Sequence, residues 1–220
     1  MHEKIVQLKM IALDGKNRQT DTLDTEGIFR LIESVPSPKA EPFKMWLASL
    51  GKERIDEVFD PEKAIDRAID YYRKKGYSDS WIEVRLKGIL NCKKLTDVWK
   101  ENGITKNYEY AILTNEIYKA WSGMKANEYK DFKGIRKESL RDNMDNLELI
   151  LTDLSEETAK RLAEKHKPVG LDGNIKVAKV GGNVAKVARC ELESNLGESI
   201  ITSSNRLDYE YDNKEMITQK

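Results

Sequence analysis

Three prolines within seven residues, Pro36, Pro38 and Pro42, place the strongest constraint on how this chain can fold. The residue before a proline is pushed out of the α-helical region, so the apolar helical pattern that precedes Pro36 must end there. Ser37 with Pro38 has the composition of a helix start, an N-cap followed by proline in the first turn. A second apolar helical pattern follows and is expected to end at Gly51. The sequence therefore predicts a rigid corner between two packed helices.

The remaining pattern is helical apart from the two ends of the chain. "IVQLKMIAL" and the residues after Asp14-Gly15 indicate a short β-hairpin. Asp24 or Thr25 is expected to cap the helix that follows, and Ser80 with Glu83 fits a capping box for a later one. A last helix is predicted from about residue 174 to 196, hinged at its Gly-Gly pair, before a short terminal strand in "GESIITSSN".

These patterns predict a mainly α fold, a multi-helix bundle with a short N-terminal β-hairpin and a long C-terminal helical segment. The expected domains are 1–110, with the hairpin and the first helices, and 111–205, which is helical. Residues 206–220 are expected to form a flexible acidic tail.

Composition limits the function classes. The chain has 38 Lys and Arg against 38 Asp and Glu, so attraction to DNA or to a membrane has to come from local patches. No apolar run approaches the ~20 residues that span a bilayer. Two cysteines, Cys92 and Cys190, favour a reduced, cytoplasmic protein with free thiols.

The motifs of common enzymes are absent from the sequence. There is no Gly-x-x-x-x-Gly-Lys-Ser/Thr phosphate loop and no Gly-x-Ser-x-Gly nucleophile elbow. The two histidines, His2 and His166, are isolated, which makes a zinc site improbable. Carboxylates between Asp14 and Glu26 are explained by turns and helix caps more simply than by a metal. We therefore expect a protein that is not an enzyme and that binds no metal or cofactor.

Two features could contact nucleic acid. "ILTNEIYKAWSGMKANEYKDFKGIRK" has the spacing of a helix-turn-helix, although helix pairs of this shape are also common in plain bundles. Residues 159–190 form the second feature, with eight Lys and Arg against two Asp and Glu. Such a block could follow a phosphate backbone, or it could pair with the acidic segment just before it.

A further pattern concerns self-association. Apolar residues step by four, three, four and three along Leu140, Met144, Leu147, Leu151 and Leu154, which is a heptad seam. Intramolecular packing explains this seam, and homodimerisation through it is the alternative. Small residues around Gly181 and Gly182 would let another helix approach closely.

Several long tracts carry a resemblance to known families. "QLKMIALDGKNRQTDTLDTEGIFRLIESVPSPKAEPFKMWLASLG" resembles the second half of the BRO N-terminal domain of phage antirepressors. "SLRDNMDNLELILTDL" and "GGNVAKVARCELESNLGESIITSSN", with neighbouring segments, resemble the DNA damage-inducible protein D (DinD) family over roughly residues 7–207. A full BRO domain extends further ahead of residue 7, so DNA contacts attributed to that portion are not carried over.

The resemblance implies a non-enzymatic role in the bacterial DNA-damage (SOS) response or in phage regulation. The first hypothesis is a regulator that acts on DNA, single-stranded rather than sequence-specific duplex, or on recombinase-coated single strands. The alternative is an antirepressor-like interaction module that binds a repressor or recombinase without contacting DNA. The candidate phosphate contacts, chosen by charge and position, are Lys16, Arg18, Lys39, Lys44, Lys125, Lys130, Lys133 and Arg136.

Overall fold

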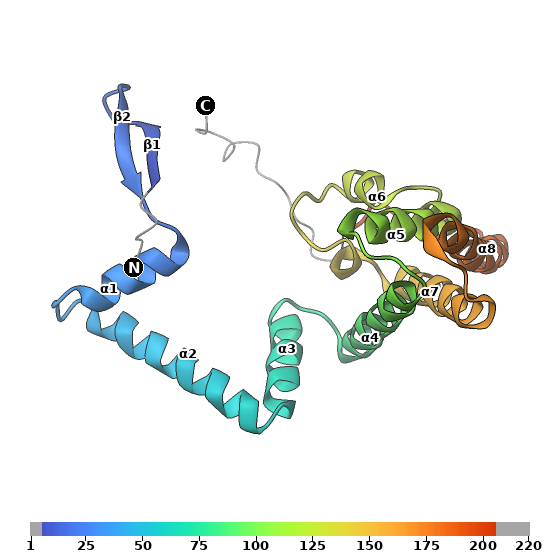
Figure 1. Ribbon diagram of the computed structural model, residues 1–220, viewed down its shortest axis with the longest axis horizontal. Coiled ribbons are helices and arrows are strands. Elements are labelled where there is room, and N and C mark those ends of the chain that lie inside the picture. The colour runs from blue at the N-terminus through green and yellow to red at the C-terminus, as the bar shows by residue number, and fades with distance from the viewer. Residues whose placement is uncertain (1–5, 206–220) are drawn as a thin grey trace. The chain divides into compact units, whose positions relative to one another are not determined.

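The computed structural model describes residues 6–205 and confirms a mainly α fold with an N-terminal hairpin (Figure 1). The predicted acidic tail, 206–220, lies outside the described residues. The strands are β1 (Val6–Ile11) and β2 (Asn17–Thr22). The helices are α1 (Thr25–Ser34), α2 (Glu41–Phe59), α3 (Glu62–Lys74), α4 (Asp79–Glu101), α5 (Asn107–Ser122), α6 (Ala126–Phe132), α7 (Asn146–His166) and α8 (Gly170–Leu196), with a 3₁₀ turn at Arg141–Asn143.

The chain divides into two compact units, Met1–Ala68 and Ile69–Lys220, called here the N-terminal and C-terminal units. This division differs from the boundary that we expected at residue 110. The reason lies in α4, which packs along α7 and contributes Trp81, Leu95 and Trp99 to the buried core of the C-terminal unit. A helix so deeply buried against α7 cannot belong to a separate N-terminal domain.

The hairpin of the N-terminal unit forms as the sequence predicts. β1 and β2 pair antiparallel, with Val6 opposite Thr22 and Ile11 opposite Asn17. Gly15 in the turn has φ of 78°, a conformation that glycine adopts without a steric penalty. Asp24 caps α1, and its carboxylate accepts from the Gly27 amide at 2.8 Å.

The proline corner forms, but the second helix starts later and ends later than predicted. α1 stops at Ser34, residues 37–40 make a turn, and α2 begins at Glu41. Pro42 therefore falls in the first turn of α2, where its missing N–H costs nothing. The Lys44 ammonium donates to the carbonyl oxygen of Val35 at 2.9 Å and ties the two helices together. α2 continues through Gly51 to Phe59, because one interior glycine costs only about 1 kcal/mol.

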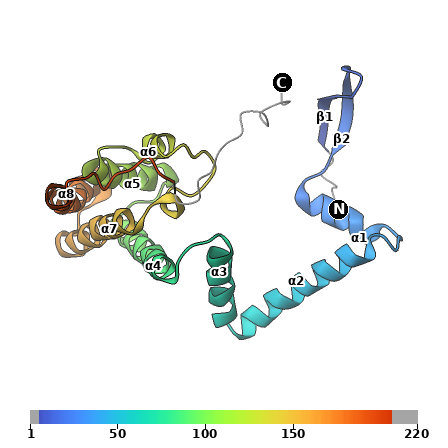
Figure 2. The same cartoon turned by 180° about the vertical axis from the view of Figure 1, so that it is seen from behind.

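The C-terminal unit contains the core. α4 packs on α7, α7 on α8 and α8 on α5, and Figures 1 and 2 show α7 between α4 and α8 from both sides. Trp81 stacks on Tyr77 at 4.0 Å between ring centroids, and its indole N–H donates to the carbonyl oxygen of Met144 at 2.9 Å. α4 is capped by Ser78 and not by the predicted Ser80, with the Ser78 hydroxyl accepting from the Trp81 amide.

α8 runs uninterrupted, so the predicted hinge at Gly181-Gly182 is wrong, whereas the predicted close helix approach there is confirmed. A Cβ placed on Gly181 would lie 2.6 Å from the Ser155 carbonyl oxygen in α7. A Cβ on Gly182 would lie 2.5 Å from the Ala120 Cβ in α5. The two glycines therefore let α8 pack tightly against two helices at once. The predicted terminal strand is also absent from the described residues, which are irregular after Gly197, with Ile200 buried.

The predicted heptad seam is not one helical stripe. α7 begins only at Asn146, so Leu140 and Met144 lie in the preceding loop, on either side of the 3₁₀ turn. Leu140, Met144 and Leu151 are buried inside the unit, which agrees with the intramolecular alternative. Leu147 and Leu154 are partly exposed. Because three of the five residues already lie in the core, only Leu147 and Leu154 are left to contact a second copy, and homodimerisation itself stays a prediction.

Candidate nucleic-acid interface

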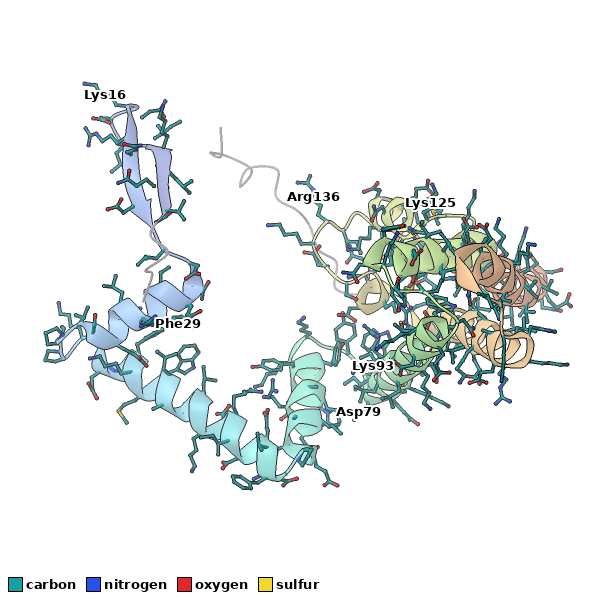
Figure 3. All side chains as sticks on the ribbon, viewed as in Figure 1. Lys16, Phe29, Asp79, Lys93, Lys125 and Arg136 are labelled. Atoms are coloured by element: carbon teal, nitrogen blue, oxygen red, sulfur yellow. The ribbon has the colours of Figure 1, made fainter. Side chains whose placement is uncertain are left out.

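The four candidate cations of the N-terminal unit differ in how far they are available. Figure 3 shows Lys16 at the tip of the hairpin, where it is exposed. Arg18 is exposed but its guanidinium lies 2.6 Å from the carboxylate of Asp14. Lys39 is exposed in the turn after α1, whereas Lys44 is half-buried and its ammonium is committed to the helix corner. Of these four cations, Lys16 and Lys39 are therefore the two that are exposed and form no described ion pair.

The helix-turn-helix spacing corresponds to α5 and α6, joined through Gly123, whose φ is 86°. The start of α6 is fixed by side chains: Asn115 accepts from the Ala126 amide at 3.0 Å, and Glu128 accepts from the Lys125 amide at 2.7 Å. α6 has seven residues, which is short for a helix that reads a groove. The geometry of α6 is suited to packing against α5 at least as well as to reading a DNA groove.

Lys133 is a correction to the predicted site. Its side chain is fully buried, and its ammonium lies 2.9 Å from the carboxylate of Glu148. It also donates to the carbonyl oxygens of Thr202 at 3.1 Å and Ser204 at 2.9 Å. Tyr129 donates its hydroxyl to the same carboxylate. Lys133 therefore holds the C-terminal segment onto the bundle and cannot contact a phosphate.

Burial governs the protonation of this cluster. It raises the pKa of Glu148, against the opposing effects of Tyr129 and Lys133, and it raises the pKa of Tyr129 far above its ordinary value, with the Glu148 carboxylate acting in the same direction. One signal in the sequence could have indicated this: Lys133 follows Tyr129 by four residues, so both share the inner face of α6.

The other candidates of this region remain on the surface. Lys125 and Arg136 are exposed and Lys130 is half-buried, as Figure 3 shows for the two that it labels. Glu128 and Asp131 lie on the same short helix and offset these charges. Without Lys133, the predicted phosphate contacts in and around α6 are reduced to Lys125, Lys130 and Arg136.

The basic block of residues 159–190 is only partly neutralised by acidic neighbours. Arg161 pairs with Glu157 at 2.8 Å and Lys179 with Glu116 at 3.5 Å. Lys160 and Arg189 also form ion pairs, with Glu157 and Glu193. Among the residues that the structure describes, Lys165, Lys167, Lys176 and Lys186 have no such partner. Half of the eight cations of this block are therefore paired with carboxylates, and the other four lie exposed at the surface.

Three of these unpaired lysines, Lys165, Lys167 and Lys176, lie at one end of the C-terminal unit. The turn between α7 and α8 is held to the end of α4, where the Gly170 amide donates to the Asn102 carbonyl oxygen at 2.9 Å. The Asn102 side-chain amide donates to the Oδ1 of Asn174 at 3.4 Å. Segments 93–106 and 160–176 therefore meet there, and together they carry nine Lys and Arg against four Asp and Glu. We call the cations of these two segments the basic end.

The basic end also carries an exposed aromatic ring. Tyr108, at the start of α5, is 55% exposed, and the Lys106 ammonium lies 5.6 Å from its ring centroid. Sequence reasoning did not single out this ring, because its exposure depends on where α5 begins. A cation beside an exposed aromatic face is suited to a phosphate with a stacked base.

Comparison with known proteins adds no identity. No protein-family model matches the chain, and no curated protein matches it. Within residues 6–205, no group of His, Cys, Asp and Glu side chains is arranged to hold a metal ion. None of the helices in that range combines the length and the apolar character that crossing a bilayer requires.

Proposed function

We propose that this protein is a non-enzymatic, DNA-associated regulator of the DNA-damage response, acting on DNA or on recombinase-coated single strands. The resemblance to the DNA damage-inducible protein D family supports the biological setting. The observation that carries the proposal is the basic end. Its two segments lie side by side and together contain nine Lys and Arg but only four Asp and Glu. The basic end replaces α6 as the principal phosphate-contacting surface.

The chemistry of the basic end favours binding that does not depend on base sequence. Lysine ammonium groups contact phosphate oxygens as point charges, and the release of condensed counterions supplies the free energy. Tyr108 offers a flat face on which an unpaired base can stack, a contact worth about 1–3 kcal/mol per base. Stacking of this kind requires an unpaired base, so single strands are the preferred substrate in this proposal.

The test is fluorescence anisotropy of labelled single- and double-stranded oligonucleotides, titrated with the full chain at about 50 and 200 mM salt, a range over which phosphate-driven binding weakens steeply. Two variants with equal changes in net charge locate the surface. One replaces Lys165, Lys167 and Lys176 with Gln, and the other replaces Lys125, Lys130 and Arg136 with Gln. Loss of affinity and a shallower salt dependence in the first variant alone supports the basic end.

Two outcomes contradict this proposal. Equal losses in both triple variants would assign the binding to overall charge, and no binding by the unaltered chain at low salt would exclude direct DNA contact. Replacing Tyr108 with Leu should weaken binding to single strands more than to duplexes. If it weakens both equally, the stacking contact is excluded.

A specific observation favours a second function, an antirepressor-like module that binds another protein without contacting DNA. In the N-terminal unit, none of the described residues is fully buried, and Leu8, Leu13 and Phe59 are exposed. Apolar surface of this extent marks a protein contact. Under this alternative, replacing Leu8 and Leu13 with Asp abolishes binding to a purified recombinase filament, whereas the Lys165, Lys167 and Lys176 variant keeps it.

A further inference from the structure

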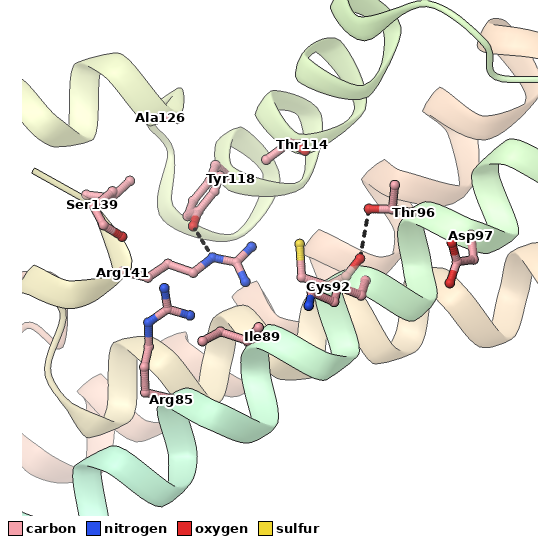
Figure 4. A pocket seen from close by; sticks show the side chains of 12 residues that line it. Arg85, Ile89, Cys92, Thr96, Asp97, Thr114, Tyr118, Ala126, Ser139 and Arg141 are labelled. Carbon is pink, nitrogen blue, oxygen red and sulfur yellow. Dashed lines mark hydrogen bonds between the residues drawn. The ribbon is translucent and has the colours of Figure 1, made fainter. Parts of the chain in front are cut away.

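The C-terminal unit contains a cavity that shares only Lys93 with the basic end. α4 packs on α7 and α5 packs on α8, but α4 and α5 do not pack closely against each other. The open side between them holds a cavity of about 650 Å³ (Figure 4). The start of α6 at Ala126 and the loop at Ser139–Arg141 border it. Small-molecule sites commonly have volumes of about 300–1,000 Å³.

The walls of the cavity are mainly apolar. Ile89 and Leu140 contribute alkyl groups and Tyr118 contributes a ring, and the polar side chains of Thr96, Asp97 and Thr114 also line the cavity. The Thr96 hydroxyl is satisfied by the Cys92 carbonyl oxygen at 2.8 Å, so it makes no demand on a ligand. A ligand that fills this space therefore needs a hydrophobic body.

Two arginines line the cavity, and they differ in how many of their nitrogens are engaged in hydrogen bonds and ion pairs. Arg141 is held on all sides: its Nε donates to the Tyr118 hydroxyl at 3.0 Å and its terminal groups form a two-point contact with Glu156. Burial disfavours its charge, yet Tyr118 and Glu156 keep the pKa of Arg141 above its ordinary value. Arg141 is therefore a structural cation.

Arg85 has fewer fixed partners than Arg141, namely the Asp142 carboxylate and the Tyr72 hydroxyl. Its Nε donates to the Asp142 carboxylate at 2.7 Å, and its terminal amino groups are in no ion pair with the described residues. Its side chain is only 11% exposed, and Figure 4 shows its guanidinium beside that of Arg141, between α4 and the loop that carries Ser139. Lys93 adds an exposed ammonium at the cavity, also without an ion pair among the described residues. A guanidinium whose terminal amino groups are in no ion pair is suited to bind the two oxygens of a carboxylate or sulfonate.

We propose that the cavity between α4 and α5 binds a small organic anion with an aromatic or aliphatic body and one carboxylate or sulfonate group. The body lies against Ile89, Leu140 and the Tyr118 ring. The oxyanion accepts hydrogen bonds from the terminal nitrogens of Arg85, with Lys93 adding charge at the entrance. This inference does not depend on DNA binding, and either can fail without the other.

Cys92 provides a local reporter for the test. Its thiol lines the cavity, whereas Cys190 is exposed on α8, so one sample contains a reporter and an internal control. Burial raises the pKa of the Cys92 thiol, so alkylation is followed at about pH 9 to obtain a measurable rate. The reagent is iodoacetamide, which is neutral and small, and the two modified peptides are quantified separately by mass spectrometry.

The probe is 1-anilinonaphthalene-8-sulfonate, and N-phenyl-1-naphthylamine is the matched neutral compound with the same aromatic body. In the full chain, we expect the sulfonate to slow alkylation of Cys92 in a saturable way and to leave Cys190 unchanged. R85Q should weaken protection by the sulfonate about tenfold, the effect of losing a charge-assisted hydrogen bond, and leave protection by the neutral compound unchanged. K93Q should weaken it less, and K87Q, on the same helix outside the cavity, should have no effect.

Three results would overturn the proposal. If neither compound protects Cys92, the cavity takes no such ligand. If both protect it equally, and R85Q and K93Q change nothing, anion recognition is excluded. If protection of Cys190 matches that of Cys92, the probe binds the surface generally. Because K93Q changes an exposed side chain, it keeps the test decisive even if R85Q, which breaks the contact with Asp142, fails to fold.

Discussion

The two units have similar helical patterns but differ in what the helices bury. α4, α5, α7 and α8 enclose a core that includes three of the four tryptophans. The N-terminal unit instead has only a surface cluster of aromatic rings. The ring centroid of Phe43 lies 5.7 Å from that of Phe29 and 5.2 Å from that of Trp46, and Trp46 remains 47% exposed. Caps and turns are enough to shape local elements, but stability comes from apolar burial.

This difference matters for function, because a unit that fully buries none of its described residues has surface available for a partner. The C-terminal unit buries many of its apolar residues in its own core, and it offers charge at the basic end and a cavity between α4 and α5. We therefore expect perturbations of the C-terminal unit to change the free energy of unfolding, and equivalent perturbations of the N-terminal unit to leave it unchanged.

The largest effect is expected at the buried ion pair. K133M should lower the free energy of unfolding by about 3–5 kcal/mol, because it leaves the Glu148 carboxylate buried without its cation. K137M, four residues away and exposed, is the matched control and should change stability by less than about 0.5 kcal/mol. Urea unfolding measures both. Equal stabilities of the two variants would contradict the burial of Lys133.

Ionisation of buried tyrosines should act on the C-terminal unit alone, since residues 1–68 contain no tyrosine. Burial raises the pKa values of Tyr72, Tyr118 and Tyr129 in the folded chain. Their stabilising contribution is complete below pH 10 and is lost as the pH rises above it, because the unfolded chain then releases protons that the folded chain retains. Each proton that only the folded chain retains lowers the free energy of unfolding by about 1.4 kcal/mol per pH unit.

The measurement is urea unfolding between pH 9 and 11.5, with tyrosinate absorbance followed in parallel. Y118F should reduce the slope of stability against pH, although it also removes a contact to Arg141. If all nine tyrosines ionise with an ordinary pKa near 10 while the helices remain intact, the buried positions of these three side chains are wrong.

Glycine substitutions compare a packed helix with an unpacked one. G182A should destabilise the chain by about 1–3 kcal/mol, because the added Cβ collides with Ala120. G51A, in α2 of the N-terminal unit, meets nothing within 4 Å. It should stabilise the helical state of α2 by about 1 kcal/mol, which is the intrinsic preference for alanine over glycine. The midpoint of global unfolding should not change. Circular dichroism and urea unfolding separate the two effects.

Helix caps give the smallest and most direct comparison. S78A removes the cap of α4 and should cost about 1 kcal/mol of global stability. D24A removes the equivalent cap of α1 and should lower only the helicity of the N-terminal unit. If D24A shifts the midpoint of the unfolding of the whole chain as much as S78A does, the two units unfold together.

Local features of the fold were predictable from the sequence. The hairpin turn at Gly15, the Asp24 cap and the close approach at Gly181 and Gly182 each depend on one residue type in one backbone setting. The extent of α2 beyond Gly51 was not predictable in the same way, because a single glycine weakens a helix without deciding whether it ends.

Tertiary pairing explains the remaining errors. Lys133 looked like a surface cation because its partner, Glu148, is fifteen residues away and is brought to it by the loop before α7. The heptad spacing from Leu140 to Leu154 mixed loop and helix positions, which periodicity alone cannot separate. The basic end joins segments about sixty residues apart, so the sequence identified only its longer half.

Hydrogen exchange of the full chain, followed by mass spectrometry, tests the central comparison most directly. Slow exchange opened only by global unfolding is expected for α4, α5, α7 and α8. Peptides from β1, β2, α1 and α2 are expected to exchange orders of magnitude faster, at rates close to those of local helix opening. Equally slow exchange in α1 and α2 would contradict the account, because it would mean that the N-terminal unit shares the stability of the core.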